Sequence, residues 1–202
     1  MRLALFASGG GSNAAEILDA AGTLGVEPAV LITDRPRARA LDRATARGIP
    51  TAVLAPGDYA DEAAFGEALI DALARAEVEG IVLAGYLKKL PASVVWAYRD
   101  KILNVHPSLL PAFGGPGFYG ERVHRAVLAR GCRVSGATVH LVTAEYDAGP
   151  IVLQQAVDVL PDDSPETLAA RVLAVEHELL PRAVGLLAAG RLRVADGVVE
   201  IL

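Results

Sequence analysis

The chain has 202 residues, of which 52% are hydrophobic and only 5% are aromatic. This composition is typical of a globular domain with its own core and excludes a disordered chain. The formal net charge of −5 and the lack of a basic block argue against a nucleic-acid partner. The single cysteine, Cys132, excludes an intramolecular disulfide and a cysteine-based metal cluster.

Membrane and secretion signals are not found in the sequence. No apolar run reaches the roughly 18 residues that a membrane-spanning helix needs. The first apolar run ends at Ala7, before glycines, and is too short for the hydrophobic region of a signal peptide. We therefore expect a cytoplasmic protein without a membrane partner.

Short aliphatic and β-branched runs alternate with helical segments in the first half of the chain. Buried strands are expected at residues 3–7, 28–33, 51–54, 80–84 and 102–105. Helices are expected from the first glycine-rich loop to about residue 21, from 37 to 48, and from 61 to 76. Gly22 is expected to end the first helix. The alternation predicts a parallel sheet that is covered by helices on both faces.

The pattern changes after about residue 130. Two apolar runs, 137–142 and 151–157, are joined by a loop too short for a crossover helix, so they should pair antiparallel. A last helix should begin at Ser164-Pro165 and run to about Ala188. The sequence thus predicts a single α/β domain over 1–202. Its fold should be a Rossmann-like, three-layer open sheet, mostly parallel with an antiparallel C-terminal portion.

Open α/β sheets bind ligands at the carboxyl ends of their strands. This rule selects four loops, at residues 8–13, 85–90, 104–120 and 143–149.

The first loop has the sequence Gly9-Gly10-Gly11-Ser12-Asn13-Ala14 and allows three interpretations. It fits a relaxed dinucleotide-binding pattern, with Asp34 placed to bind a ribose. It also suits a phosphate monoester, because glycines let the backbone approach an anion and a helix N-terminus offers free amides. In the third interpretation Ser12 only caps the helix. The loop alone does not separate them.

Asn104 and His106 form the most informative pair. Residues two apart in a strand project to the same side, and burying two polar side chains there is costly without a purpose. An amide and an imidazole can both hydrogen-bond an oxyanion, and a histidine can transfer a proton at neutral pH. This is the chemistry of acyl transfer. The alternative is that the pair only ties down the loop that begins at Pro107.

Two motifs resemble those of a known family. Asn104-Val105-His106-Pro107-Ser108-Leu109-Leu110-Pro111 resembles the signature of folate-dependent formyltransferases. The segment 145–151, with Asp147 before Ala148-Gly149, resembles their second signature. Among the branches, the phosphoribosylglycinamide formyltransferases are the most similar, through the loop 8–13 and the pair Glu176-His177. The resemblance covers about residues 2–195.

The resemblance implies an enzyme that moves a formyl group from 10-formyltetrahydrofolate to the amine of glycinamide ribonucleotide in purine biosynthesis. It implies no metal, and a monomer or homodimer. Asn104 and His106 would polarise the formyl oxygen. Asp147 would orient or charge His106 and help to remove the amine proton. Because a carboxylate favours a protonated imidazole, we expect Asp147 to raise the pKa of His106, and a protonated His106 to stabilise the oxyanion together with Asn104.

The resemblance also implies two sets of binding residues. The substrate phosphate would be held by Gly11, Ser12 and Asn13, and the ribose by Glu176. The folate would be bound by Leu87, Lys88, Lys89, Leu90, Asn104, Thr143, Ala144, Glu145, Tyr146 and Asp147.

Two departures from the family pattern stand out. The segment 112–120 is glycine-rich and longer than in many members, and its aromatic residues either shape the mouth of the site or pack on the next helix. Glu62 lies about where some members carry a basic residue.

The other histidines, His124 and His177, lie on expected helices, and His140 lies on an expected strand. His124 is expected to be structural or solvated, whereas His140 either supports Asp147 or has a plain structural role. A formyltetrahydrofolate hydrolase, a NAD-dependent enzyme and a non-catalytic phosphate-binding module stay open as alternatives.

Overall fold

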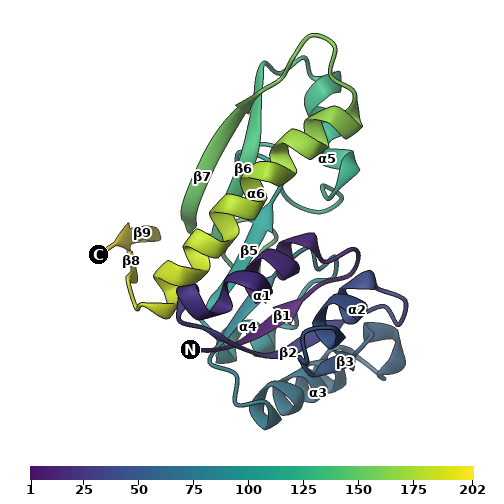
Figure 1. The fold of residues 1–202 in the computed structure, drawn as a ribbon, viewed down its shortest axis with the longest axis vertical. Coiled ribbons are helices and arrows are strands. Elements are labelled where there is room, and N and C mark those ends of the chain that lie inside the picture. The colour runs from purple at the N-terminus through teal and green to yellow at the C-terminus, as the bar shows by residue number, and fades with distance from the viewer.

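The computed structural model describes residues 1–202 and places seven strands in one sheet (Figure 1). In spatial order these are β3 (Thr51–Val53), β2 (Glu27–Thr33), β1 (Arg2–Phe6), β4 (Gly80–Leu83), β5 (Ile102–His106), β6 (Val134–Leu141) and β7 (Ile151–Asp158). The first five are parallel, and β6 is antiparallel to both β5 and β7. The predicted fold class, a mostly parallel sheet with an antiparallel C-terminal portion, is confirmed.

Helices cover both faces of the sheet. One face carries α1 (Ser12–Leu24), α2 (Arg39–Thr45), α5 (Glu121–Ala129) and α6 (Pro165–Ala188), and the other carries α3 (Glu62–Arg75) and α4 (Ala92–Ala97). Alternate residues of β1 serve the two cores: Leu3 and Leu5 face the first, and Ala4 and Phe6 face the second. This two-sided burial explains why the strands are apolar throughout rather than alternating.

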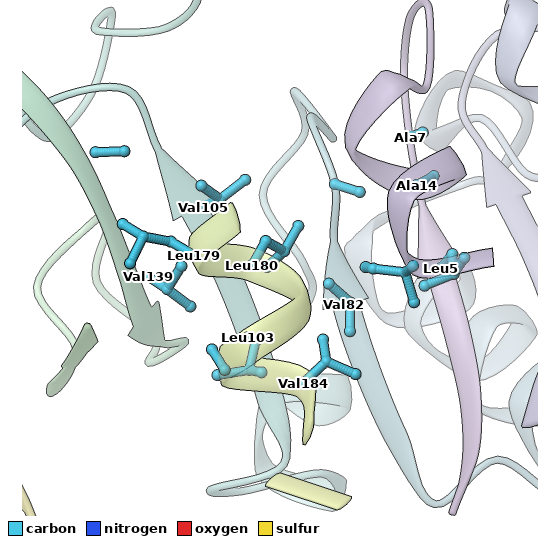
Figure 2. Packing of buried hydrophobic residues seen from close by; sticks show 14 of the residues in the cluster. Leu5, Ala7, Ala14, Val82, Leu103, Val105, Val139, Leu179, Leu180 and Val184 are labelled. Carbon is cyan, nitrogen blue, oxygen red and sulfur yellow. The ribbon is translucent and has the colours of Figure 1, made fainter. Parts of the chain in front are cut away.

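The long helix α6 packs on β5, β6 and β7 and on the helix α1. Leu179, Leu180 and Val184 are buried in the same cluster as Leu103 and Val105 of β5 (Figure 2). Each such side chain contributes roughly 1.5–3 kcal/mol when it is removed from water. The helix begins at the predicted cap, where Ser164 and Thr167 form a reciprocal capping box.

Some elements differ from the predictions. The first helix does not end at Gly22 but continues to Leu24, because Gly25 adopts the left-handed conformation (φ 69°) that ends a helix. The second helix starts only at Arg39. Three short elements were not predicted: the 3-10 turn η1 (Pro56–Asp58), α4, and a C-terminal hairpin of β8 (Leu192–Ala195) and β9 (Val198–Ile201). Each of these helices and strands has six residues or fewer, which is too short to show a clear hydrophobic period.

The strand order reverses direction between β1 and β4. Crevices form at such switch points. The loops that follow these two strands are tied together, since Ser8 N donates to Gly85 O (3.0 Å) and Leu87 N donates to Ser8 Oγ (2.9 Å). No helix of the chain is long and apolar enough to cross a membrane.

Candidate active site

A cavity of about 690 Å³ opens at the carboxyl ends of the central strands. This volume lies in the range of sites that bind small ligands. All four predicted loops contribute to it, with Asn13, Leu87, Asn104, His106 and Asp147 among the lining residues. Glu176, Lys88, Lys89, Leu90, Thr143, Glu145 and Tyr146 line it too. Of the predicted site residues, Gly11, Ser12 and Ala144 do not line the cavity itself.

Asn104 is held by a neighbour on the adjacent strand. It lies opposite His140 in the pairing of β5 with β6, and its Nδ2 is 3.0 Å from His140 Nε2. His140 Nδ1 is 2.9 Å from Leu141 O, which can only accept, so Nδ1 carries the proton. In the neutral ring, Nε2 is then an acceptor, and Asn104 must turn its NH₂ group towards it. The second hydrogen of that NH₂ group stays free for a ligand.

The buried ring of His106 lies between the carbonyl of Phe113 and the carboxylate of Asp147. Its Nε2 donates to Phe113 O (2.8 Å), and its Nδ1 lies 3.6 Å from Asp147 Oδ2. Burial lowers the pKa of His106, and this outweighs the opposing effects of Asp147 and the Phe113 carbonyl. Asp147 thus raises the pKa of His106, as expected from the sequence, but not enough to bring it above its ordinary value. The cost of burying the imidazolium exceeds the attraction of a carboxylate beyond hydrogen-bonding distance.

Asp147 completes this group from the loop between β6 and β7. Its backbone is left-handed (φ 51°), a conformation that aspartate tolerates better than most residues. Oδ2 accepts from Gly115 N (2.8 Å), and Oδ1 lies 3.7 Å from His140 Nε2. Burial raises the pKa of Asp147, but the two histidines and the Gly115 amide together outweigh it and hold the pKa below its usual value. The carboxylate is thus ionised at neutral pH.

The first loop leads directly into α1. Gly11 is the N-cap residue, with φ 67°, and Ser12 is already the first helical residue and makes no side-chain cap bond. The interpretation of Ser12 as a cap is therefore wrong. The backbone N–H groups of Gly10, Gly11, Ser12 and Asn13 donate to no other group of the chain. Four free amides at a helix N-terminus suit an anion.

Glu176 of α6 forms a buried pair with the same loop. Asn13 Nδ2 donates to Glu176 Oε2 (2.6 Å). Burial raises the pKa of Glu176 to about 7, and the hydrogen bond from Asn13 opposes that rise only in part. Asn13 Oδ1 has no partner. The pair therefore presents unused hydrogen-bonding capacity beside the free amides.

This pKa predicts a pH-dependent stability. The ordinary pKa of a glutamate is 4.5, and that of Glu176 in the folded protein is about 7. Between these two pH values Glu176 is protonated in the folded protein but ionised in the unfolded chain. Stability from Glu176 is complete below pH 4.5 and is lost as the pH rises through 7, by at most about 3 kcal/mol. Urea unfolding should show the wild type and Glu176→Gln alike near pH 4.5, and the wild type weaker at pH 8. A difference between the two proteins that does not change with pH would contradict this.

The predicted folate residues lie on two facing loops. Leu87, Lys88 and Lys89 are exposed, whereas Leu90 is buried in the core. Lys89 Nζ lies 5.7 Å from the ring centre of Tyr146, so the two loops approach each other at the mouth. A smaller cavity of about 440 Å³ adjoins the lysines and is lined by the exposed Glu62. The first turn of α3, which contains Glu62, carries no basic residue.

His124 was not identified from the sequence as a residue of the site. His124 is buried, lines the cavity, and has its pKa lowered by burial. Phe118 and Tyr119 also line the cavity, while Phe118 stacks edge-on with Phe113 and Tyr119 packs under the Arg122 guanidinium of α5. Both interpretations of the aromatic residues therefore hold. Asp34, the proposed ribose-binding acid of the dinucleotide interpretation, does not line the cavity.

Comparison with known proteins identifies the family. The family model described as formyl transferase matches residues 1–184. The chain belongs to the formyl transferase family. It is 43% identical to the chloroplastic phosphoribosylglycinamide formyltransferase of Arabidopsis thaliana, over 95% of this chain and 67% of that protein. It is 38% identical to the phosphoribosylglycinamide formyltransferase of Bacillus subtilis, over 91% of this chain and 92% of that one.

Solved structures of this family have the same fold. The chain matches glycinamide ribonucleotide transformylase 1 from Symbiobacterium toebii with a TM-score of 0.94 and 41% identity, over 100% and 94% of the two chains. A formyltetrahydrofolate deformylase from Pseudomonas syringae matches with a TM-score of 0.89 and 28% identity. The chain spans only 65% of that deformylase.

Proposed function

We propose that the protein transfers the formyl group of 10-formyltetrahydrofolate to the amine of 5′-phosphoribosylglycinamide, a step of purine biosynthesis. The observation that carries this proposal is the meeting of Asn104, His106 and Asp147 in one cavity beside a helix N-terminus with free amides. Membership of the formyl transferase family supports it, as do relatives that carry this activity in their names. The family match also favours formyl transfer over the dinucleotide interpretation.

The substrate phosphate would bind the amides of Gly11, Ser12 and Asn13, where the dipole of α1 adds favourable charge. Glu176 would accept hydrogen bonds from the ribose hydroxyls. At the other end, Leu87, Leu90 and the loop 143–147 would hold the folate ring system. Lys88 and Lys89 stand at the mouth, where their charge suits the carboxylates of a folate. The reacting amine and formyl carbon would then meet at Asn104 and His106.

The transfer needs charge stabilisation on one oxygen and the movement of one proton. The amine nitrogen attacks the formyl carbon, a new C–N bond forms, and the carbonyl electron pair moves to oxygen. The free N–H of Asn104 would donate to that oxyanion, and such a donor is commonly worth about 10²–10³ in rate. The N–H at His106 Nε2, which donates to the Phe113 carbonyl in the free protein, would donate to the oxyanion instead.

The proton leaves the attacking amine towards the ionised carboxylate of Asp147. The oxyanion then re-forms the carbonyl, the bond between the formyl carbon and the folate nitrogen breaks, and Asp147 returns the proton to that nitrogen. The products are formylglycinamide ribonucleotide and tetrahydrofolate. Because burial lowers the pKa of His106, its ring is mostly neutral at pH 7. Asp147 therefore supplies a negative charge to the site, whereas His106 acts as a neutral hydrogen-bond donor.

The test compares folate turnover with and without the amine substrate. We expect tetrahydrofolate to form from 10-formyltetrahydrofolate only when 5′-phosphoribosylglycinamide is present. Equal turnover in its absence would instead identify a hydrolase, the activity named for the Pseudomonas syringae protein of similar fold. No turnover with both substrates, together with binding of phosphate ligands alone, would indicate a non-catalytic binding module.

The contact of His140 with Asn104 predicts different effects for two substitutions. In His140→Asn the side chain can still donate to Leu141 O but no longer reaches Asn104. His140→Gln can still place an acceptor near Asn104 Nδ2. We expect kcat to fall about 10- to 100-fold in the asparagine variant and much less in the glutamine variant, with both KM values little changed. Equal kcat values in the two variants would show that His140 does not orient Asn104.

A further inference from the structure

The helix α2 holds all three glycines of the loop that joins β1 to α1, and it lies next to that loop in Figure 1. Ala40 N donates to Gly9 O (3.1 Å), and Arg43 Nε donates to Gly10 O (2.8 Å). Gly11 packs so closely on α2 that a Cβ placed there would lie 2.6 Å from the Cβ of Ala40. The conformation of the loop therefore depends on its contacts with α2 as well as on its own glycines.

These two hydrogen bonds determine the direction of the neighbouring amides. In a trans peptide the C=O and the following N–H point in opposite directions, and the only cis bond of the chain is Leu110–Pro111. Because Gly9 O and Gly10 O both point towards α2, the N–H groups of Gly10 and Gly11 point away from it. Those N–H groups are among the amides that have no partner in the chain.

Arg43 also brings a positive charge that is in no direct ion pair, although it helps to lower the pKa of Asp19. It is exposed, forms no ion pair, and makes its single hydrogen bond to the Gly10 carbonyl. Arg39, one turn earlier on α2, is also exposed and unpaired, but of these two arginines only Arg43 is hydrogen-bonded to the loop. The amides and the dipole of α1 offer only partial charges, whereas a phosphate monoester is close to a dianion at neutral pH.

We propose that Arg43 is a positioning residue for the substrate phosphate. Its bond to the Gly10 carbonyl turns the Gly11 N–H towards the ligand, and its unpaired charge attracts the dianion. This inference rests on the proposed function, because it assumes a phosphorylated substrate. It adds a residue outside the signature loops, supplied by a helix that does not line the catalytic cavity.

The test replaces Arg43 and measures both substrates separately. Arg43→Gln should raise KM for 5′-phosphoribosylglycinamide roughly tenfold or more, as expected for a lost charged hydrogen bond. The kcat and the KM for 10-formyltetrahydrofolate should change little. Arg43→Lys keeps the charge and one N–H donor, so its KM should lie between those of the wild type and the glutamine variant.

Arg39→Gln is the matched control. Arg39 lies one turn earlier on α2, is also exposed, and has no hydrogen bond or ion pair through its side chain. If Arg39→Gln raises the KM as much as Arg43→Gln does, net charge alone is responsible and the positioning role is wrong. An unchanged KM in Arg43→Gln would overturn it as well.

Calorimetry with 5′-phosphoribosylglycinamide alone separates the two proposals. Binding by the wild type, weakened in Arg43→Gln, supports both. Equal binding by both proteins rejects the role of Arg43 and leaves the proposed function intact. If the wild type does not bind this nucleotide, the proposed function fails and the inference about Arg43 fails with it.

Discussion

Replacing Asp147 with asparagine should lower kcat by about 10²–10⁴-fold, the usual worth of a positioned proton acceptor. The amide cannot accept the amine proton. It also removes the charge that partly offsets burial at His106, so the pKa of His106 should fall further. Asparagine tolerates the left-handed backbone at this position, so the fold should survive. Steady-state kinetics and thermal unfolding of the purified variant measure the two effects.

Asp196→Asn is the control for this substitution. Asp196 also has a left-handed backbone (φ 50°), but it lies in the turn of the β8–β9 hairpin, away from the cavity. We expect wild-type kcat in this variant. If Asp147→Asn keeps kcat within about tenfold of the wild type, Asp147 does not take part in the proton transfer.

Replacing Gly149 with alanine should destabilise the protein by about 3 kcal/mol or more, in the range of severe overpacking. A Cβ at this position would lie 1.8 Å from Leu141 O and 2.9 Å from Leu141 C. These are backbone atoms at the end of β6, which pairs with the central strand β5, so they cannot move aside cheaply. The loop that carries Asp147 would have to shift instead, and activity should fall with stability.

Urea unfolding of Gly149→Ala measures this effect, with Gly22→Ala as the control. Gly22 lies within α1, and a Cβ there meets no atom within 4 Å. Alanine favours a helix interior over glycine by up to about 1 kcal/mol, so the control should be as stable as the wild type or slightly more stable. A loss of less than about 1 kcal/mol in Gly149→Ala would mean that the loop yields easily, contrary to the close packing described above.

Much of the fold follows from local patterns in the sequence. The apolar runs identified the strands of the parallel sheet, and the short connection after residue 142 identified the antiparallel pair. Helix ends were less predictable, because Gly22 and Gly25 are both plausible stops and only the backbone conformation of Gly25 decides between them. The short helix α4 and the terminal hairpin carry no distinct period, so their existence depends on tertiary packing.

The candidate site was predictable in its residues but not in its electrostatics. The spacing of Asn104 and His106 indicated a polar pair on one side of a strand, which the structure places in the cavity. The pKa of His106 depends on how deeply the fold buries the ring, and spacing along the chain carries no information on that. Contacts between residues far apart in the sequence were equally unpredictable. Arg43 donates to Gly10 O only because α2 packs against the first loop.

The most direct test follows the formyl carbon itself. The enzyme is incubated with 5′-phosphoribosylglycinamide and 10-formyltetrahydrofolate that carries carbon-13 in the formyl group, and the products are analysed by mass spectrometry. The proposed function predicts one labelled formyl group on the substrate amine for each tetrahydrofolate released. Labelled free formate beside an unchanged amine, or no turnover at micromolar enzyme, would contradict it.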